Sequence, residues 1–170
     1  MWTYTGKGRP DFAKAPGPGQ ESVWDYPRPP ALAPDARRVR VHHDGSVLAD
    51  STRAVRILET ASPPTFYLPP DDVNVAALVA AAGQSFCEWK GLASYLALKA
   101  APESQAVAWY YTEPTAPFES LAGYIAFYPS RVTCFVDEER VRPQAGEFYG
   151  GWVTDEIVGP FKGDPSTGHW

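Results

Sequence analysis

The clearest pattern of hydrophobic and polar positions lies in residues 38–59, where side chains alternate with a period of two. In VRVHH (39–43) the valines alternate with charged or polar residues, as expected for a strand with one buried face. The Asp44–Gly45 pair that follows is typical of a tight hairpin turn, because both central residues of a type I′ turn need positive φ. The sequence therefore predicts a hairpin whose returning strand is residues 46–50, and then a third strand at residues 54–59.

The proline-rich stretch 61–73 interrupts this pattern. Proline lacks the N–H donor that a central strand needs, so we expect residues 65–68, between two pairs of prolines, to form a short edge segment. Pro70 followed by two aspartates is typical of a helix start, since carboxylates are favourable at the N-terminal end of the helix dipole. The alanine-rich residues 75–82 then predict the longest helix of the chain, ended by Gly83.

Short strands with bulky side chains dominate the second half of the chain. We expect strands at residues 95–99, 106–111, 124–128 and 132–136, and a single helical turn at residues 117–122. The whole pattern predicts a mainly β (α+β) fold of compact antiparallel sheets, tent-like or barrel-like, with one main helix. The strands are too short and too closely connected for a parallel doubly wound sheet.

Both ends of the chain differ from this core in composition. Residues 1–37 are rich in proline and glycine and carry five large aromatic side chains that are unfavourable to leave in water. We expect this segment to lie along the body of the protein as an extended strap; a flexible, polyproline-like leader is the alternative. Residues 139–170, again rich in glycine and aromatic residues, predict a second strap, so that residues 38–138 form the core domain.

The composition and net charge of the chain disfavour some classes of binding partner. At 170 residues the chain has the length of one domain. Its formal net charge of -5 and pI of about 5.2 disfavour nucleic acid and anionic membranes, which are bound through clustered Lys and Arg. No segment approaches the roughly 20 apolar residues that cross a bilayer, and the N-terminus has no apolar signal core. We therefore expect a cytoplasmic protein.

The cysteines and histidines form no pattern typical of a metal site. The two cysteines, Cys87 and Cys134, are far apart in the chain, and the three histidines show no ligand spacing to one another or to the cysteines. We therefore predict no metal ion and, in a reducing compartment, no disulfide. The sequence indicates neither a particular cofactor nor an oligomeric state.

The stretch CEWKGLASY (87–95) brings a thiol, an ammonium group and two aromatic rings close together in the sequence. Cys87 would be a nucleophile if Lys90 stabilised its thiolate, and is otherwise an inert buried thiol. Lys90 beside a glycine is suited to binding a phosphate or carboxylate; the alternative is a solvated lysine whose stem covers Trp89. Glu59, at the end of an apolar strand, is a candidate acid or base, or else a partner for an Arg or Lys. Cys87, Lys90 and Glu59 are the candidate catalytic residues.

Aromatic side chains predict a binding surface around this stretch. Five of them are candidates for a wall that holds a planar or cationic ligand: Tyr67, Trp89, Tyr95, Trp109 and Tyr111. An aromatic core is the alternative interpretation. Lys162, also followed by a glycine, resembles a second basic loop. We expect a domain that binds a small molecule in an aromatic cleft, whether or not it also catalyses a reaction. The alternatives are a nucleotidyl or acyl transferase that uses the same cleft, and a protein-interaction module whose proline-rich straps dock a partner.

Five motifs in a fixed order connect the chain to a known family. They are VRVHHDGSVLADSTRAVRILE (39–59), PPTFYLPPDDV (63–73), CEWKG (87–91), AWYYTEP (108–114) and AFYPSRV (126–132). In these motifs the chain resembles the bacterial family called domain of unknown function 427 (DUF427), and its flanking segments VWDYPRPP and EFYGGW resemble those of the longer actinobacterial members. The resemblance implies a small mainly β domain with an aromatic cleft and implies no particular reaction.

Members of this family sometimes carry a nucleotidyltransferase label. Such enzymes need a Gly-Ser turn followed by a pair of acidic residues that hold Mg²⁺. The chain has Gly45–Ser46, but only Asp50 follows it closely. Asp71–Asp72 are neighbours whose side chains would point to opposite sides of an extended chain. The sequence therefore lacks the spaced acidic pair that this activity requires.

Overall fold

The computed structural model describes residues 1–170 and consists of short strands joined by turns and short helices. The strands are β1 (Glu21–Ser22), β2 (Ala31–Asp35), β3 (Val39–His43), β4 (Ser46–Ser51), β5 (Ala54–Leu58), β6 (Thr65–Leu68), β7 (Leu78–Cys87), β8 (Gly91–Leu98), β9 (Ala108–Tyr111), β10 (Ile125–Phe127), β11 (Thr133–Val136), β12 (Glu139–Arg140), β13 (Arg142–Pro143), β14 (Trp152–Val153) and β15 (Ile157–Val158). The helices, all of the 3₁₀ type, are η1 (Val23–Asp25), η2 (Pro70–Asp72), η3 (Val75–Ala77) and η4 (Ala116–Leu121). None of them has the length and apolar character that crossing a membrane requires.

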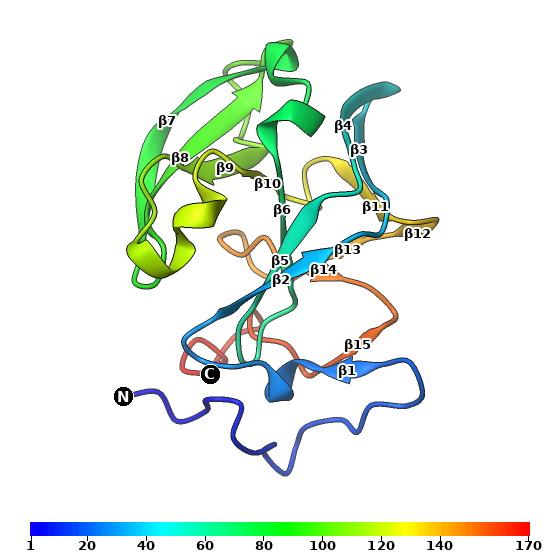
Figure 1. Cartoon of the computed structure of the whole chain (residues 1–170), viewed down its shortest axis with the longest axis vertical. Coiled ribbons are helices and arrows are strands. Elements are labelled where there is room, and N and C mark those ends of the chain that lie inside the picture. The colour runs from blue at the N-terminus through cyan, green and yellow to red at the C-terminus, as the bar shows by residue number, and fades with distance from the viewer.

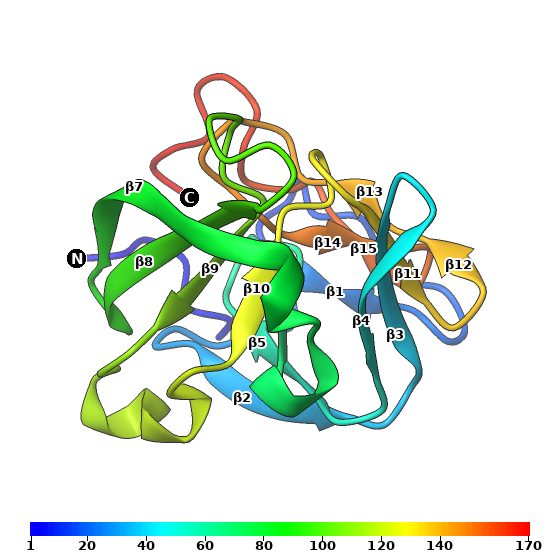
Figure 2. The same ribbon diagram turned by 90° about the horizontal axis from the view of Figure 1, so that it is seen from above.

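Two antiparallel sheets form most of the molecule, which confirms the predicted mainly β fold. The larger sheet has seven strands in the order β2-β5-β6-β10-β9-β8-β7, and the smaller has four in the order β12-β11-β3-β4. Seen from above, the four-stranded sheet lies to one side of the strongly twisted larger sheet (Figure 2). The predicted β3–β4 hairpin is present, and Asp44 and Gly45 in its turn have φ values of 46° and 78°.

The main core lies between these two sheets. Val39 and Val41 of the smaller sheet belong to the same buried cluster as Phe66 and Phe127 of the larger sheet. Trp152 of β14 completes this cluster, with its ring stacked on Phe66 at 4.7 Å between ring centres. Residues from stretches far apart in the chain therefore bury their apolar surface together, which is the main stabilising contribution to the fold.

A second buried cluster covers the opposite face of the seven-stranded sheet. Because side chains alternate along a strand, Phe66 and Leu68 point into the main core while Tyr67 points into the second cluster. On β9, Ala108 and Trp109 divide in the same way. The second cluster is dominated by aromatic rings, and it is the face on which the candidate site lies.

The two terminal segments pack against each other and against the sheet, at the bottom of the molecule in Figure 1. Strand β1 pairs in parallel with β15, so a segment from each end of the chain shares one small sheet. Trp24 is fully buried there, and its indole N–H donates to the carbonyl oxygen of Pro160 at 3.1 Å. The rings of Phe12 and Trp170 stack with their centres 5.2 Å apart. Extended segments without regular structure are thus held by aromatic packing.

The predicted main helix at residues 75–82 is wrong. Only Val75–Ala77 form a helical turn. Residues 78–87 form β7, which pairs with β8 from Leu78 to Cys87, next to the turn of the hairpin. Gly83 does not end a helix; it has a φ of 87° at a point where the register of this pairing shifts. Alanine favours helix only weakly, and pairing along a ten-residue strand outweighs that local preference.

The predicted edge position of residues 65–68 is also wrong. These residues form β6, which lies between β5 and β10 inside the seven-stranded sheet. The flanking prolines limit β6 to four residues without removing any of its own N–H donors. Strand β2, at residues 31–35, lies at one edge of this sheet. The prolines in and around it made it part of the predicted N-terminal strap.

Candidate functional site

The candidate site lies on the face of the seven-stranded sheet that points away from the main core. Pairing between strands sets one row of side chains across β5, β6, β10, β9 and β8: Val55, Tyr67, Ala126, Trp109 and Tyr95. Paired residues in a row point to the same face, so three large rings from distant parts of the sequence meet. Sheet register therefore builds the aromatic wall.

The β7–β8 hairpin adds a second group of site residues. Ser85 and Cys87 lie two residues apart on β7 and so share a face. Tyr111 of β9 lies in the same row as Ser85, through Ala93 of β8. Lys90 follows in the hairpin turn. A thiol, an ammonium group and a phenol are thus positioned at one end of the aromatic wall.

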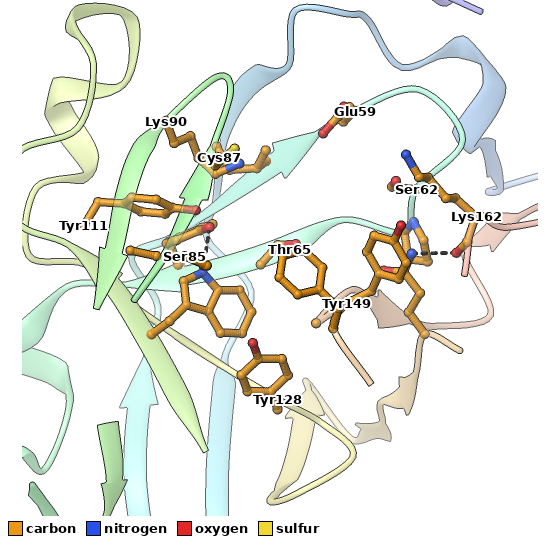
Figure 3. Close-up of a pocket in the computed structure, with 18 of the residues that line it drawn as sticks. Glu59, Ser62, Thr65, Ser85, Cys87, Lys90, Tyr111, Tyr128, Tyr149 and Lys162 are labelled. Carbon is orange, nitrogen blue, oxygen red and sulfur yellow. Dashed lines mark hydrogen bonds between the residues drawn. The ribbon is translucent and has the colours of Figure 1, made fainter. Parts of the chain in front are cut away.

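A cavity of about 200 Å³ lies in front of these side chains. Figure 3 shows its two sides, with Lys90, Cys87 and Tyr111 on one and Tyr149 and Lys162 on the other. The second side belongs to the C-terminal segment. The cavity is therefore bounded by the core sheet and by a part of the chain that follows it.

Gln144 fixes the C-terminal side of the cavity. Its side chain accepts a hydrogen bond from the backbone N–H of Gly151 at 3.1 Å and donates one to the carbonyl oxygen of Lys162 at 2.6 Å. Gly150 packs directly on the ring of Trp109, where a Cβ atom would overlap the ring. The absence of a side chain at this position lets the C-terminal segment approach the aromatic wall closely.

Lys90 brings a buried positive charge to the cavity. The residue is only 8% exposed, and its ammonium lies 5.8 Å from the ring centre of Tyr111 and 6.0 Å from that of Phe118. It forms no ion pair, because Glu59, the one carboxylate that lines the cavity, pairs with Arg28. Its side-chain hydrogen-bonding partner is the thiol of Cys87, and the two rings add a weaker attraction.

The surroundings keep Lys90 protonated. Burial lowers the pKa of its amine, because a charged group is poorly solvated there, but Tyr67, Cys87 and Glu59 raise that pKa by more. The pKa of Lys90 therefore stands above its ordinary value. At neutral pH the cavity holds an ammonium group with three N–H donors.

Glu59 is held at the rim of the cavity by two donors. Its Oε1 accepts hydrogen bonds from Arg28 Nε at 3.2 Å and from Trp89 Nε1 at 3.3 Å. The Arg28 side chain is almost completely buried and also donates to the backbone carbonyls of Tyr4 and Thr60. The carboxylate is thus a fixed, paired charge that links the site to the N-terminal segment.

The tyrosine hydroxyls supply further donors to the cavity. Burial raises the pKa of Tyr67, of Tyr111 and of Tyr128 above the ordinary phenol value, so each keeps its proton at neutral pH. Tyr67 accepts a hydrogen bond from the indole N–H of Trp109 at 3.1 Å, which leaves its own proton available for another acceptor. The cavity is therefore rich in donors.

Lys162 differs from Lys90 in both contacts and charge environment. Its ammonium donates to the carbonyl oxygen of Trp170 at 3.2 Å and lies 4.9 Å from the ring centre of Trp2. Burial lowers its pKa, and the positive charge of Arg28 lowers it further. Lys162 is thus already partnered within the protein.

The structure brings together most of the residues singled out from the sequence. Seven of the eight line the one cavity: Glu59, Tyr67, Cys87, Lys90, Tyr95, Trp109 and Tyr111. Trp89 lies outside the lining and acts through its hydrogen bond to Glu59. Several lining residues carry no motif in the sequence that would mark them as part of a site: Ser62, Thr65, Ser85, Tyr128, Gln144 and Tyr149. The glycine- and aromatic-rich composition of the C-terminal segment was the signal available for Tyr149.

The acidic residues considered for a nucleotidyltransferase lie elsewhere. Asp50 pairs with Arg38 on the four-stranded sheet, and Asp72 pairs with Arg53. No three His, Cys, Asp or Glu side chains are grouped so that they could hold a metal ion. The arrangement at the cavity is suited instead to holding an anion against aromatic rings.

Residues 31–138 match the family model described as Domain of unknown function (DUF427). The chain belongs to this family. Among curated proteins none matches the chain. The DUF427 match begins at β2 and ends before β13, so Arg28, Tyr149 and Lys162 lie outside it. Segments on both sides of the family domain therefore complete the cavity and its charge pairing.

Proposed function

We propose that this DUF427 protein binds a small molecule that has a planar ring and one anionic group, with the ring against the aromatic wall and the anion at Lys90. The observation that carries the proposal is the Lys90 ammonium, which is buried, faces the cavity and has no carboxylate partner, since Glu59 pairs with Arg28. Burying a charge is unfavourable unless it is paired. A ligand anion would provide the missing partner.

The neighbouring hydroxyls support binding of an anion. Tyr67 and Tyr111 line the cavity next to Lys90 and stay protonated at neutral pH, so they act as donors toward a negatively charged oxygen. Hydrogen bonds to an ionised group are shorter and stronger than those between neutral groups. An ammonium and two phenols would together hold one carboxylate or phosphate group.

The size and charge of the cavity favour a small monoanion. Its volume of about 200 Å³ is below the range of roughly 300–1,000 Å³ that is common for drug-sized ligands, so a single ring fits better than a nucleotide. Of the cationic side chains near the cavity, Arg28 is paired with Glu59 and Lys162 with a backbone carbonyl. Lys90 alone remains for the ligand.

The test is a thermal unfolding series with benzoate, its neutral analogue benzamide, and phenyl phosphate. A ligand present at 100 times its Kd stabilises the folded state by about 2.7 kcal/mol. For a chain of this length that corresponds to a rise in Tm of roughly 5–10 °C, at about 2–4 °C for each kcal/mol. We expect benzoate to raise the Tm more than benzamide, with phenyl phosphate showing which anion the site prefers.

A matched pair of variants shows whether Lys90 is responsible. Lys90→Met keeps the length of the side chain and removes the charge, so benzoate should no longer raise the Tm. Lys99→Met removes the same charge from an exposed position at the end of β8 and should respond as the wild type does. Equal stabilisation by benzoate and benzamide, or an unchanged benzoate response in Lys90→Met, would contradict the proposal.

The transferase alternative is tested in the same series. Stabilisation by ATP that depends on Mg²⁺ would favour a nucleotidyl transferase that uses this cleft. Indifference to nucleotides, together with a response to benzoate, would favour the small-acid site.

A further inference from the structure

Cys87 occupies a position in this cavity that the binding of an anion leaves unused. Its half-buried thiol lines the cavity at the end of β7, and Figure 3 shows it beside Lys90 on the side where Tyr111 also lies. Lys90, Tyr111 and Tyr67 line the same cavity as Cys87, and the thiol of Cys87 raises the pKa of all three groups. A thiol is thus surrounded by one ammonium and two phenol hydroxyls.

From this arrangement we infer that Cys87 is a nucleophile that accepts the acyl group of an activated ester of a small aromatic acid and forms a thioester in the cavity. The inference rests on the proposed function, because the acyl group would occupy the place of the acid's ring and carboxylate. It adds a reaction to what would otherwise be a binding site.

The neighbouring groups suit each stage of such a step. The thiolate is the form of a cysteine that attacks carbon. When the thiolate adds to the carbonyl carbon, negative charge develops on the carbonyl oxygen, and donors such as Lys90, Tyr67 and Tyr111 stabilise charge at that point. The side chains that would bind a carboxylate would therefore also bind the oxyanion.

The step is balanced with an aryl ester as the acyl donor. The thiol proton passes to solvent when the thiolate forms. The sulfur lone pair then makes the S–C bond, the C–O bond to the aryl group breaks with its electron pair, and the aryl oxide leaves as an anion. The products are the benzoyl thioester of Cys87 and one phenolate, with no oxidation or reduction.

The second cysteine provides an internal control. Cys134 is 1% exposed in the main core, and burial raises the pKa of its thiol. A buried thiol in apolar surroundings is unreactive. The two cysteines should therefore behave differently in the same folded chain.

The experiment uses 4-nitrophenyl benzoate with the folded full-length protein. Release of 4-nitrophenolate is followed by absorbance, and the acylated residue is identified by peptide mass spectrometry. We expect one benzoyl group per chain, on Cys87 and not on Cys134, formed at least about tenfold faster than on free N-acetylcysteine. Benzoylation no faster than that of N-acetylcysteine, or located on a lysine, would overturn the inference.

Three variants separate this inference from the proposed function. Cys87→Ala should lose both the benzoyl group and the rapid release of 4-nitrophenolate. Lys90→Met should slow benzoylation of Cys87 by roughly 100-fold, the effect of removing an oxyanion donor. Lys99→Met should react at the wild-type rate. If benzoate stabilises the protein but Cys87 is not acylated, the binding proposal stands and the nucleophile is rejected. If Cys87 in Lys90→Met is acylated at the wild-type rate, the proposed role of Lys90 in stabilising the oxyanion is also rejected.

Discussion

Trp109 donates its indole N–H to the hydroxyl oxygen of Tyr67 at 3.1 Å, although their strands, β9 and β6, are not neighbours. Strand β10 lies between them, and Ala126 is the residue paired with both. The small side chain of Ala126 allows the two rings to meet above it, edge to face, with centres 6.2 Å apart. This contact sets the floor of the cavity and the direction of the Tyr67 hydroxyl.

Tyr67→Phe should therefore affect both stability and binding. The variant leaves the buried N–H of Trp109 without an acceptor, which costs about 1–3 kcal/mol of the free energy of unfolding. It also removes a donor from the anion site, so the benzoate response should weaken. Urea unfolding measures the first effect. Tyr110→Phe, on the other face of β9, is the control, and an equal loss of stability there would contradict this explanation.

The pair of Arg28 and Glu59 should be important for the fold. Arg28→Met leaves the Glu59 carboxylate without its main partner and leaves three backbone carbonyls without this donor, so we expect a loss of about 3–5 kcal/mol, as for other buried pairs that lose one member. The pair of Arg9 and Asp25 is exposed, so Arg9→Met should reduce the free energy of unfolding far less than Arg28→Met does. Similar losses in the two variants, measured by urea unfolding, would be inconsistent with a structural role for Arg28.

Gly150→Ala should separate the C-terminal segment from the aromatic wall. A methyl group at this position overlaps the ring of Trp109, and the segment must move away to accommodate it. We expect lower benzoate affinity and a loss of roughly 1–3 kcal/mol in stability, typical of overpacking. Gly168→Ala, where nothing lies within 4 Å, should change neither property. Calorimetric titration with benzoate measures the affinity; an unchanged Kd in Gly150→Ala would show that this wall is not part of the site.

The N-terminal segment should be required for stability. Trp24→Ala removes a fully buried ring and should destabilise the protein by about 3–5 kcal/mol. A chain starting at residue 31 loses this ring and also Arg28, and should unfold at a clearly lower urea concentration. A truncated chain of unchanged stability would favour the alternative in which the segment is free to dock a partner.

The charge of Lys90 makes a specific prediction about pH. Its pKa is higher in the folded protein than in the unfolded chain, so protonation of Lys90 stabilises the fold below the unfolded pKa of about 10.4 and this contribution is lost as the pH rises through the folded pKa. We expect the rise in Tm with benzoate to be constant from about pH 6 to about pH 9, since the ammonium persists across that range. A response that disappears near neutral pH would show that Lys90 is not the anion's partner.

Local sequence signals predicted much of the fold. The alternation in residues 39–43 and the Asp44–Gly45 turn depend on backbone preferences of a few neighbouring residues, and the structure has both. The β7 strand was missed because its alanines favour helix locally, and its pairing with β8 outweighs that preference. The interior position of β6 was missed because prolines mark strand ends but do not reveal which strands lie alongside.

The sequence by itself determined the residue types of the site and the face on which many of them lie. Residues two apart on a strand share a face, so the side chains of Trp109 and Tyr111 must point to the same face of the sheet. Tertiary structure alone decided that Glu59 pairs with Arg28, that Lys90 is buried without a carboxylate partner, and that Gly150 packs on Trp109 at the cavity. These are contacts between segments far apart in the chain, and their geometry depends on how the sheets and the two terminal segments pack.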